Sequence, residues 1–210
     1  QVNGEVIRRP EFKVTEEDAV MFNGEKVRVA PEFVYYILHK PAGCVSATED
    51  SREKTVMEYI PDKRKGLFPV GRLDKDTEGL LLITDDGALN HQLLAPGKHV
   101  PKTYYARIDG IVTSADVVKF QSGLDIGEKK RTAPAILEIL HAGETDSISE
   151  IKVTITEGKY HQIKRMFEKT GKKVIYLKRL SMGSLKLDET LATGAYRPLT
   201  ESELQALKEG

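Results

Sequence analysis

Hydrophobic residues along this chain gather in short runs, which polar and glycine-containing segments separate. The densest run, residues 33–38, predicts a buried strand, and a second apolar run over residues 80–83 predicts another. Ile151, Val153 and Ile155 alternate with polar neighbours, which indicates a strand with one buried face. The same reasoning predicts further strands over residues 102–108, 135–140, 150–156 and 174–177.

Helical patterns are shorter. Residues 160–170 place Ile163, Met166 and Phe167 on one face and are followed by Gly171, which predicts a helix that ends there. Because strands predominate and do not alternate regularly with helices, the chain is predicted to be α+β with a mainly antiparallel sheet. Other helices are predicted over residues 55–60, over 88–94, from Thr113 to Gly123 and after Thr200.

The first 30 residues have a different pattern from the rest. Asn3-Gly4 and Asn23-Gly24 are turn signals between short stretches of mixed polarity, and they predict hairpins. Denser apolar runs begin only after this segment. We therefore predict two domains, residues 1–30 and residues 31–210.

Charge is balanced over the whole chain but segregated along it. Lys+Arg and Asp+Glu are both 32, which argues mildly against RNA binding because phosphate attraction normally needs excess cations. Residues 159–179, however, contain eight lysines and arginines against Glu168, whereas the segment from Asp188 onward is acidic. The basic run fits either a solvated face or a local patch for a polyanion, and charge alone leaves both open.

The sequence also carries information on compartment. Cys44 is the one cysteine and cannot form an internal disulfide, which favours a reducing environment. No stretch reaches the ~18 apolar residues of a membrane span, and the polar start does not resemble a signal peptide. The chain begins with Gln1 rather than Met, so we expect it to be part of a longer product. A cytoplasmic protein is predicted.

The segment with the most distinctive chemistry is residues 71–79, Gly-Arg-Leu-Asp-Lys-Asp-Thr-Glu-Gly, directly before the apolar run at 80–83. Glycines let a backbone turn tightly and approach a ligand closely. A carboxylate two residues from a guanidinium, as Asp74 is from Arg72, can be held ionised and aimed. An ordinary surface turn with solvated charges fits the same residues, so physics alone leaves two interpretations.

Other reactive constellations are missing from the sequence. No phosphate-binding glycine loop or dinucleotide fingerprint occurs, and the histidines do not pair at metal-ligand spacing. The sequence therefore predicts a reaction without metal or cofactor. The histidines are His39, His91, His99, His141 and His161.

Three segments in order carry a resemblance to a known family. Residues 71–79 look like the catalytic-loop motif of pseudouridine synthases, enzymes that isomerise uridine within RNA. Residues 102–104, Lys-Thr-Tyr, and residues 157–167, Glu-Gly-Lys-Tyr-His-Gln-Ile-Lys-Arg-Met-Phe, resemble the RsuA-type branch, whose substrate is 16S ribosomal RNA. The resemblance covers residues 2–207. It implies a pseudouridine synthase catalytic domain with a central RNA cleft, preceded by a truncated alpha-L type RNA-binding module that lacks its opening helices.

The resemblance also implies catalytic roles. Asp74 would attack the anomeric carbon or remove the proton from the neighbouring sugar carbon, and both routes stay open. Tyr104 would stack on a flipped base, an interaction worth ~1–3 kcal/mol. Lys164 stands where larger relatives in the superfamily carry arginine, and it would keep Asp74 ionised. Arg72 would order the loop or contact phosphate.

A second group of residues is expected to bind the substrate. Tyr160, His161 and Lys164 are expected to share a helix face beside the cleft, and Leu177 to pack against the uracil or Tyr104. The expected substrate-binding residues are Gly71, Thr77, Gly79, His161, Gln162, Arg165, Leu177 and Arg179. The basic run over residues 159–179, including Lys172 and Lys173, is expected to supply most phosphate contacts.

The favoured interpretation is a monomeric, cytoplasmic enzyme of small-subunit maturation that acts on 16S ribosomal RNA, alone or in a partly assembled subunit. The resemblance implies uridine 516 as its target. Two alternatives remain: a synthase for a large-subunit site, whose branches tend to carry arginine at the position of Lys164, and a non-catalytic RNA-binding assembly factor, against which the intact Arg72-Leu73-Asp74 argues.

Overall fold

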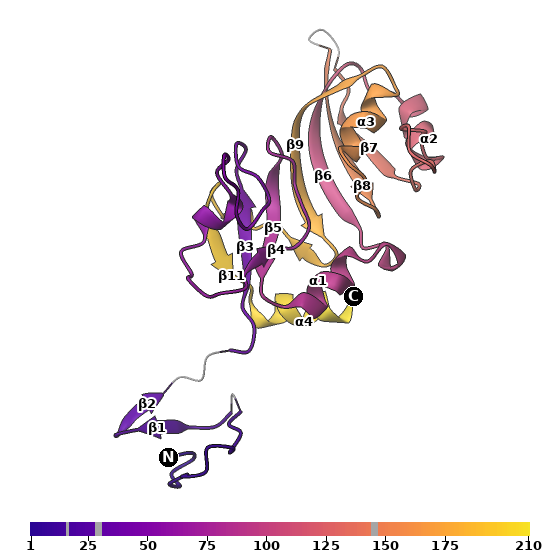
Figure 1. The fold of residues 1–210 in the computed structure, drawn as a ribbon. Coiled ribbons are helices and arrows are strands. Elements are labelled where there is room, and N and C mark those ends of the chain that lie inside the picture. The colour runs from indigo at the N-terminus through magenta and orange to yellow at the C-terminus, as the bar shows by residue number, and fades with distance from the viewer. Residues whose placement is uncertain (16, 28–30, 144–146) are drawn as a thin grey trace. The chain divides into compact units, whose positions relative to one another are not determined.

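The structure, a computed structural model, describes residues 1–15, 17–27, 31–143 and 147–210. They divide into two units, Gln1–Val34 and Tyr35–Gly210 (Figure 1). The sequence pattern placed this division after residue 30. That the first unit is the remnant of an alpha-L type module stays a prediction.

The first unit is built on two Asn-Gly turns, as the sequence predicts. β1 (Val20–Phe22) pairs with β2 (Glu25–Val27) around Asn23-Gly24, where both residues have positive φ, 49° and 83°. Positive φ at both central positions is the geometry that a two-residue hairpin turn requires. Val2 bridges to Val20 and to Glu5 on the other side of Asn3-Gly4.

The second unit is formed around a sheet whose described strands run in the order β11-β3-β5-β9-β6-β8-β7, with β10 added to β9 and β4 to β5 (Figure 1). The described strand pairs are antiparallel except β5–β9, so the predicted mainly antiparallel α+β fold is confirmed. The strands are β3 (Tyr35–Lys40), β4 (Phe68–Pro69), β5 (Glu78–Thr84), β6 (Lys102–Asp109), β7 (Ile136–His141), β8 (Ile148–Ile155), β9 (Lys173–Met182), β10 (Leu185–Lys186) and β11 (Tyr196–Pro198).

Helices cover the sheet where the apolar faces of the strands require it. α3 packs on β9 and α2 on β7, on the same face of that part of the sheet (Figure 1). Phe120 and Phe167 meet there at 4.8 Å between ring centroids. The described helices are η1 (Val56–Tyr59), α1 (Gly87–Leu94), η2 (Pro96–Lys98), α2 (Ser114–Gln121), α3 (Gln162–Glu168) and α4 (Glu201–Glu209).

Most predicted elements occur within a few residues of their predicted bounds, but two differences affect the site. α3 begins at Gln162 rather than at residue 160, because His161 has φ 48° and lies outside the helix. The prediction that Tyr160, His161 and Lys164 share a helix face is therefore wrong. β9 continues to Met182, well beyond the predicted end at Leu177.

The extension of β9 depends on one close approach between backbones. Gly79 on β5 and Arg179 on β9 are register partners in the parallel pair. A Cβ at Gly79 would stand 2.2 Å from the Arg179 carbonyl oxygen, and the φ of Gly79 is +105°. Both facts require glycine. None of the described helices is long and apolar enough to cross a membrane.

Candidate active site

The loop between β4 and β5 carries the predicted reactive residues, and two buried polar side chains fix its backbone. Ser46 Oγ accepts a hydrogen bond from the Leu73 amide at 3.0 Å and donates one to the Leu73 carbonyl at 2.9 Å. The Thr77 amide closes a turn onto the Asp74 carbonyl at 3.0 Å. The segment around Asp74 is therefore held on both sides.

Lys40 is the strongest of these ties, and sequence reasoning missed it. Its side chain is fully buried at the end of β3. Its Nζ donates to the carbonyls of Pro41, Asp74 and Thr77 at 2.9, 3.1 and 2.8 Å. Burial lowers the pKa of Lys40, and nearby acidic side chains oppose that shift only in part. The one feature of the sequence that could have indicated this role is the position of Lys40 at the end of an apolar strand, just before Pro41.

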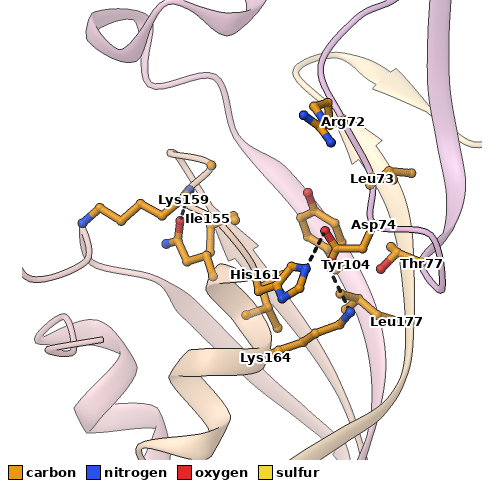
Figure 2. A pocket seen from close by; sticks show the side chains of 13 residues that line it. Arg72, Leu73, Asp74, Thr77, Tyr104, Ile155, Lys159, His161, Lys164 and Leu177 are labelled. Atoms are coloured by element: carbon orange, nitrogen blue, oxygen red, sulfur yellow. Dashed lines mark hydrogen bonds and ion pairs between the residues drawn. The ribbon is translucent and has the colours of Figure 1, made fainter. Parts of the chain in front are cut away.

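Asp74 lies between the side chains of Lys164 and His161. Lys164 Nζ from α3 is 3.0 Å from Asp74 Oδ2, and His161 Nε2 is 3.6 Å from Asp74 Oδ1 (Figure 2). The Asp74 side chain is 30% exposed, so the carboxylate is held in place while a face of it can still be reached. The predicted approach of Lys164 to Asp74 is observed.

Lys164 is shared with a second carboxylate. Its Nζ donates to Asp76 Oδ1 at 2.7 Å, shorter than its distance to Asp74. Burial tends to raise the pKa of Asp76, but the hydrogen bond and charge of Lys164 outweigh it, so this pKa is lowered. For Lys164, burial tends to lower the pKa, and the two carboxylates raise it overall. The ammonium is therefore fixed in its charged form.

A cavity opens in front of Asp74 (Figure 2). Its walls combine charged and polar side chains with apolar and aromatic ones, and Tyr104 from β6 and Leu177 from β9 lie beside the carboxylate. Tyr104 is 7% exposed and Leu177 6%, so each presents one edge or face to the cavity. An aromatic ring and an apolar side chain next to fixed polar groups suit a planar organic ligand that carries polar atoms. The remaining lining residues are Arg72, Leu73, Thr77, Ile155, Gly158, Lys159, His161, Gln162, Ile163 and Lys164.

Thr77 is notable within this lining. It is 1% exposed, and within the described part of the chain its Oγ1 has no hydrogen-bond partner. Buried hydroxyls are normally satisfied. Because Thr77 Oγ1 is itself buried, a substrate atom could reach it only after a local rearrangement, and its binding role stays a prediction.

Four predicted substrate-binding residues do not line the cavity. Gly71 and Gly79 serve backbone geometry, with φ of +73° and +105°. The guanidinium of Arg165 bonds to the Tyr160 and Ile126 carbonyls and to Glu128. Arg179 is 1% exposed, and its Nε donates to the Leu80 carbonyl. Their placement supports a structural role, and their contact with substrate stays a prediction.

Gln162 lines the cavity, but its amide is already engaged. Its Oε1 accepts from the Lys159 amide at 2.9 Å, and its Nε2 donates to Glu157 Oε1 at 2.8 Å. These bonds close the segment that leads into α3. Gln162 therefore shapes the cavity wall, and its predicted contact with substrate would require breaking these bonds.

The basic run over residues 159–179 is less available for phosphate than its sequence suggests. Lys172 Nζ is held 3.0 Å from Asp116. Lys159 Nζ donates to the carbonyls of Lys130 and Arg131. Lys164, Arg165 and Arg179 also bond to protein groups, whereas Lys169 and Lys173 are exposed. That the run supplies most phosphate contacts stays a prediction. Arg72 is an exposed cation that lines the cavity.

The geometry permits nucleophilic or base chemistry by a carboxylate on a planar ligand. Asp74 is ion-paired and aimed, Tyr104 and Leu177 supply flat contact, and Arg72 supplies an exposed cation. Within the described residues, no three His, Cys, Asp or Glu side chains gather to hold a metal ion. The expectation of a reaction without metal or cofactor stays a prediction.

Comparisons with known proteins agree with this chemistry. A family model described as RNA pseudouridylate synthase matches residues 34–169. The chain is 49% identical over 180 residues to an uncharacterised RNA pseudouridine synthase of Bacillus subtilis, YtzG, covering 85% of this chain and 74% of that protein. It is 39% identical to ribosomal small subunit pseudouridine synthase A of Haemophilus influenzae, covering 99% and 88%.

A solved structure is similar over the same extent. The crystal structure of a pseudouridylate synthase superposes with a TM-score of 0.77 at 38% identity, covering 99% of this chain and 87% of that one.

Proposed function

Because the chain belongs to the RNA pseudouridylate synthase family, we propose that it converts a uridine of small-subunit ribosomal RNA to pseudouridine. The relative from Haemophilus influenzae is named for the small ribosomal subunit and covers nearly the whole chain, which supports this substrate. Lys164 supports the same branch, since the large-subunit alternatives tend to have arginine there.

One observation carries the proposal: Asp74 is held between Lys164 and His161 at the wall of a cavity that contains Tyr104. The isomerisation breaks the bond from uracil N1 to C1′ and forms a bond from C5 to C1′. C5 loses its proton and N1 gains one, so no external oxidant or co-reactant is needed. Asp74 attacks C1′ or removes the C2′ proton, and the geometry is compatible with either route.

The surrounding side chains have complementary roles. Tyr104 and Leu177 replace the stacking that the uridine loses when it leaves the RNA, which costs a few kcal/mol. Lys164 fixes the carboxylate, and Thr77 forms part of the cavity wall. Arg72, exposed at the cavity, contacts a phosphate of the same strand.

The finer assignments belong to the same proposal. The target is uridine 516 of 16S ribosomal RNA, modified as the small subunit matures in the cytoplasm by a monomeric enzyme without metal or cofactor. The first unit, Gln1–Val34, would add RNA contacts as part of an alpha-L type module.

The test is incubation with 16S and, separately, 23S ribosomal RNA, followed by chemical marking of pseudouridine and primer extension. We expect one stop in the 16S RNA at uridine 516. A stop in 23S RNA alone would favour the large-subunit alternative. RNA binding without any stop, on naked RNA and on partly assembled subunits, would favour the assembly factor.

Asp74→Asn separates chemistry from binding. Asparagine keeps the shape and removes the charge, so release of tritium from 5-tritiated uridine in the RNA should be abolished while most RNA affinity remains. Lys164→Met should reduce the maximal rate as well as binding, because the ammonium is 3.0 Å from Asp74. Substantial turnover by Asp74→Asn would remove this carboxylate from the mechanism.

A further inference from the structure

Directly before α3, two aromatic rings are stacked at the edge of the active-site cavity. The Tyr160 and His161 rings have centroids 3.8 Å apart and an interplanar angle of 19°. Two stacked aromatic rings are usually packed in a protein interior, but Tyr160 is 73% exposed. A ring that exposed contributes little to the core, so its fixed orientation needs another explanation.

The backbone holds this pair rigidly. His161 has φ 48° and ψ 35°, a left-handed conformation that costs energy for a residue with a side chain. Arg165 Nη1 donates to the Tyr160 carbonyl at 3.0 Å, and Glu128 holds the same nitrogen at 2.8 Å. Gln162 fixes the preceding Lys159 amide. Tyr160 is thus exposed at its side chain and restrained at its main chain.

The inner ring of the pair belongs to the active site. His161 lines the cavity, with its Nε2 3.6 Å from Asp74 Oδ1 (Figure 2). Tyr160 stacks on that ring and does not line the cavity itself. The exposed tyrosine ring is therefore one ring layer removed from the histidine that touches the catalytic carboxylate.

We propose that the Tyr160–His161 pair is a stacking platform for a nucleobase that flanks the target uridine. This inference rests on the proposed function. Successive nucleotides of a single strand can stack on exposed aromatic rings, because every base has a flat face. With the uridine in the cavity, a base directly next to it in the strand remains within reach of the rim. The exposed Arg72 lines the same cavity and can meet the RNA backbone. Lys129 and Lys130 are also exposed, and the Lys130 carbonyl accepts a hydrogen bond from the cavity-lining Lys159.

The first test uses variants at Tyr160. Tyr160→Ala should raise KM for the RNA about tenfold, which corresponds to about 1.4 kcal/mol and lies within the range for one base on an aromatic side chain. The loss should fall on KM more than on kcat. Tyr160→Phe should restore the affinity because it keeps the ring, whereas Tyr160→Leu should not. A thermal unfolding curve for each variant shows whether the fold is intact.

The second test places a reporter on the base. The substrate is a fragment of small-subunit RNA that contains the modified uridine, with 2-aminopurine at the 5′ or the 3′ neighbour. Stacking on the platform should quench its fluorescence on binding to the wild type, and the quench should be lost with Tyr160→Ala. Replacing that neighbour by an abasic nucleotide should weaken binding by the wild type, with no further loss on adding Tyr160→Ala.

The outcomes separate this inference from the proposed function. If wild type forms pseudouridine but Tyr160→Ala binds and quenches as wild type does at both neighbours, the platform is refuted and the enzyme assignment stands. If Tyr160→Leu binds as tightly as Tyr160→Phe, apolar contact rather than stacking is responsible, and the platform is again refuted. If wild type forms no pseudouridine in any ribosomal RNA, the proposed function itself has failed.

Discussion

Replacing Lys40 by methionine tests whether a buried ammonium holds the catalytic loop. Methionine is close to lysine in length and fits the same apolar path along β3, but it cannot donate hydrogen bonds. The variant removes the donor that lies 2.8–3.1 Å from the carbonyls of Pro41, Asp74 and Thr77. The Asp74 carbonyl keeps its hydrogen bond from the Thr77 amide, so the loss falls mainly on the other two. The loop would then lose its anchor beneath Asp74.

The expected change in the free energy of unfolding combines the lost hydrogen bonds of Lys40 with the removal of its buried charge. A buried carbonyl left unpaired costs about 1–3 kcal/mol, so the carbonyls of Pro41 and Thr77 together cost at least about 2 kcal/mol. Removing a buried charge offsets part of this, as the lowered pKa of Lys40 indicates. We expect a net loss of about 1–2 kcal/mol, and a Tm lower by about 2–8 °C for a chain of this length.

The measurement is urea and thermal unfolding, with the tritium-release rate taken at a temperature where both proteins are folded. Lys75→Met is the matched control, because Lys75 is in the same loop but pairs with Glu53 at an exposed position. The control should stay within about 0.5 kcal/mol of wild type. If Lys40→Met is as stable and active as Lys75→Met, the ammonium does not order this loop and the reasoning fails.

Two further predictions concern charge. Arg197 holds the pKa of Glu203 at about 2, below the usual 4.5, so this pair stabilises the fold above about pH 5 and progressively less as pH falls toward 2. The Tm difference between wild type and Arg197→Met should shrink over that range; a difference independent of pH would contradict it. Lys129→Ala/Lys130→Ala should flatten the slope of log affinity against log salt by roughly 1–2 units, and an unchanged slope would exclude both as phosphate contacts.

The apolar pattern predicted the fold well because each half-buried strand has its own signature. β5 and β8 are found where apolar runs or alternation predicted them. The pattern failed at β9, where Lys178 and Arg179 look like the end of a strand. Arg179 is instead buried against the backbone of β5, at the position where Gly79 has no side chain. A contact between segments so far apart in sequence leaves no local signal.

The candidate site likewise contains residues that the sequence predicted and contacts that it did not. Asp74 and Lys164 were predicted by resemblance and meet in the structure. The stack of Tyr160 on His161 was not predicted. The sequence pattern extended the predicted helix back to residue 160, whereas α3 begins at Gln162 and leaves both residues before it. Hydrophobic periodicity cannot detect a single left-handed residue, and the geometry of this rim depends on that residue.

Net charge was the weakest guide, and the structure explains why. A net charge of zero suggests that the chain does not attract polyanions. Net charge, however, counts every charged side chain, whether or not it is buried or paired. Lys40 and Arg179 are buried and donate to backbone carbonyls. Their charges are counted in the total, but their side chains cannot reach a phosphate. Lys172 is held by Asp116 instead. Attraction for RNA at this cavity therefore depends on which cations remain exposed beside it, a quantity set by the fold and not by the sum over the sequence.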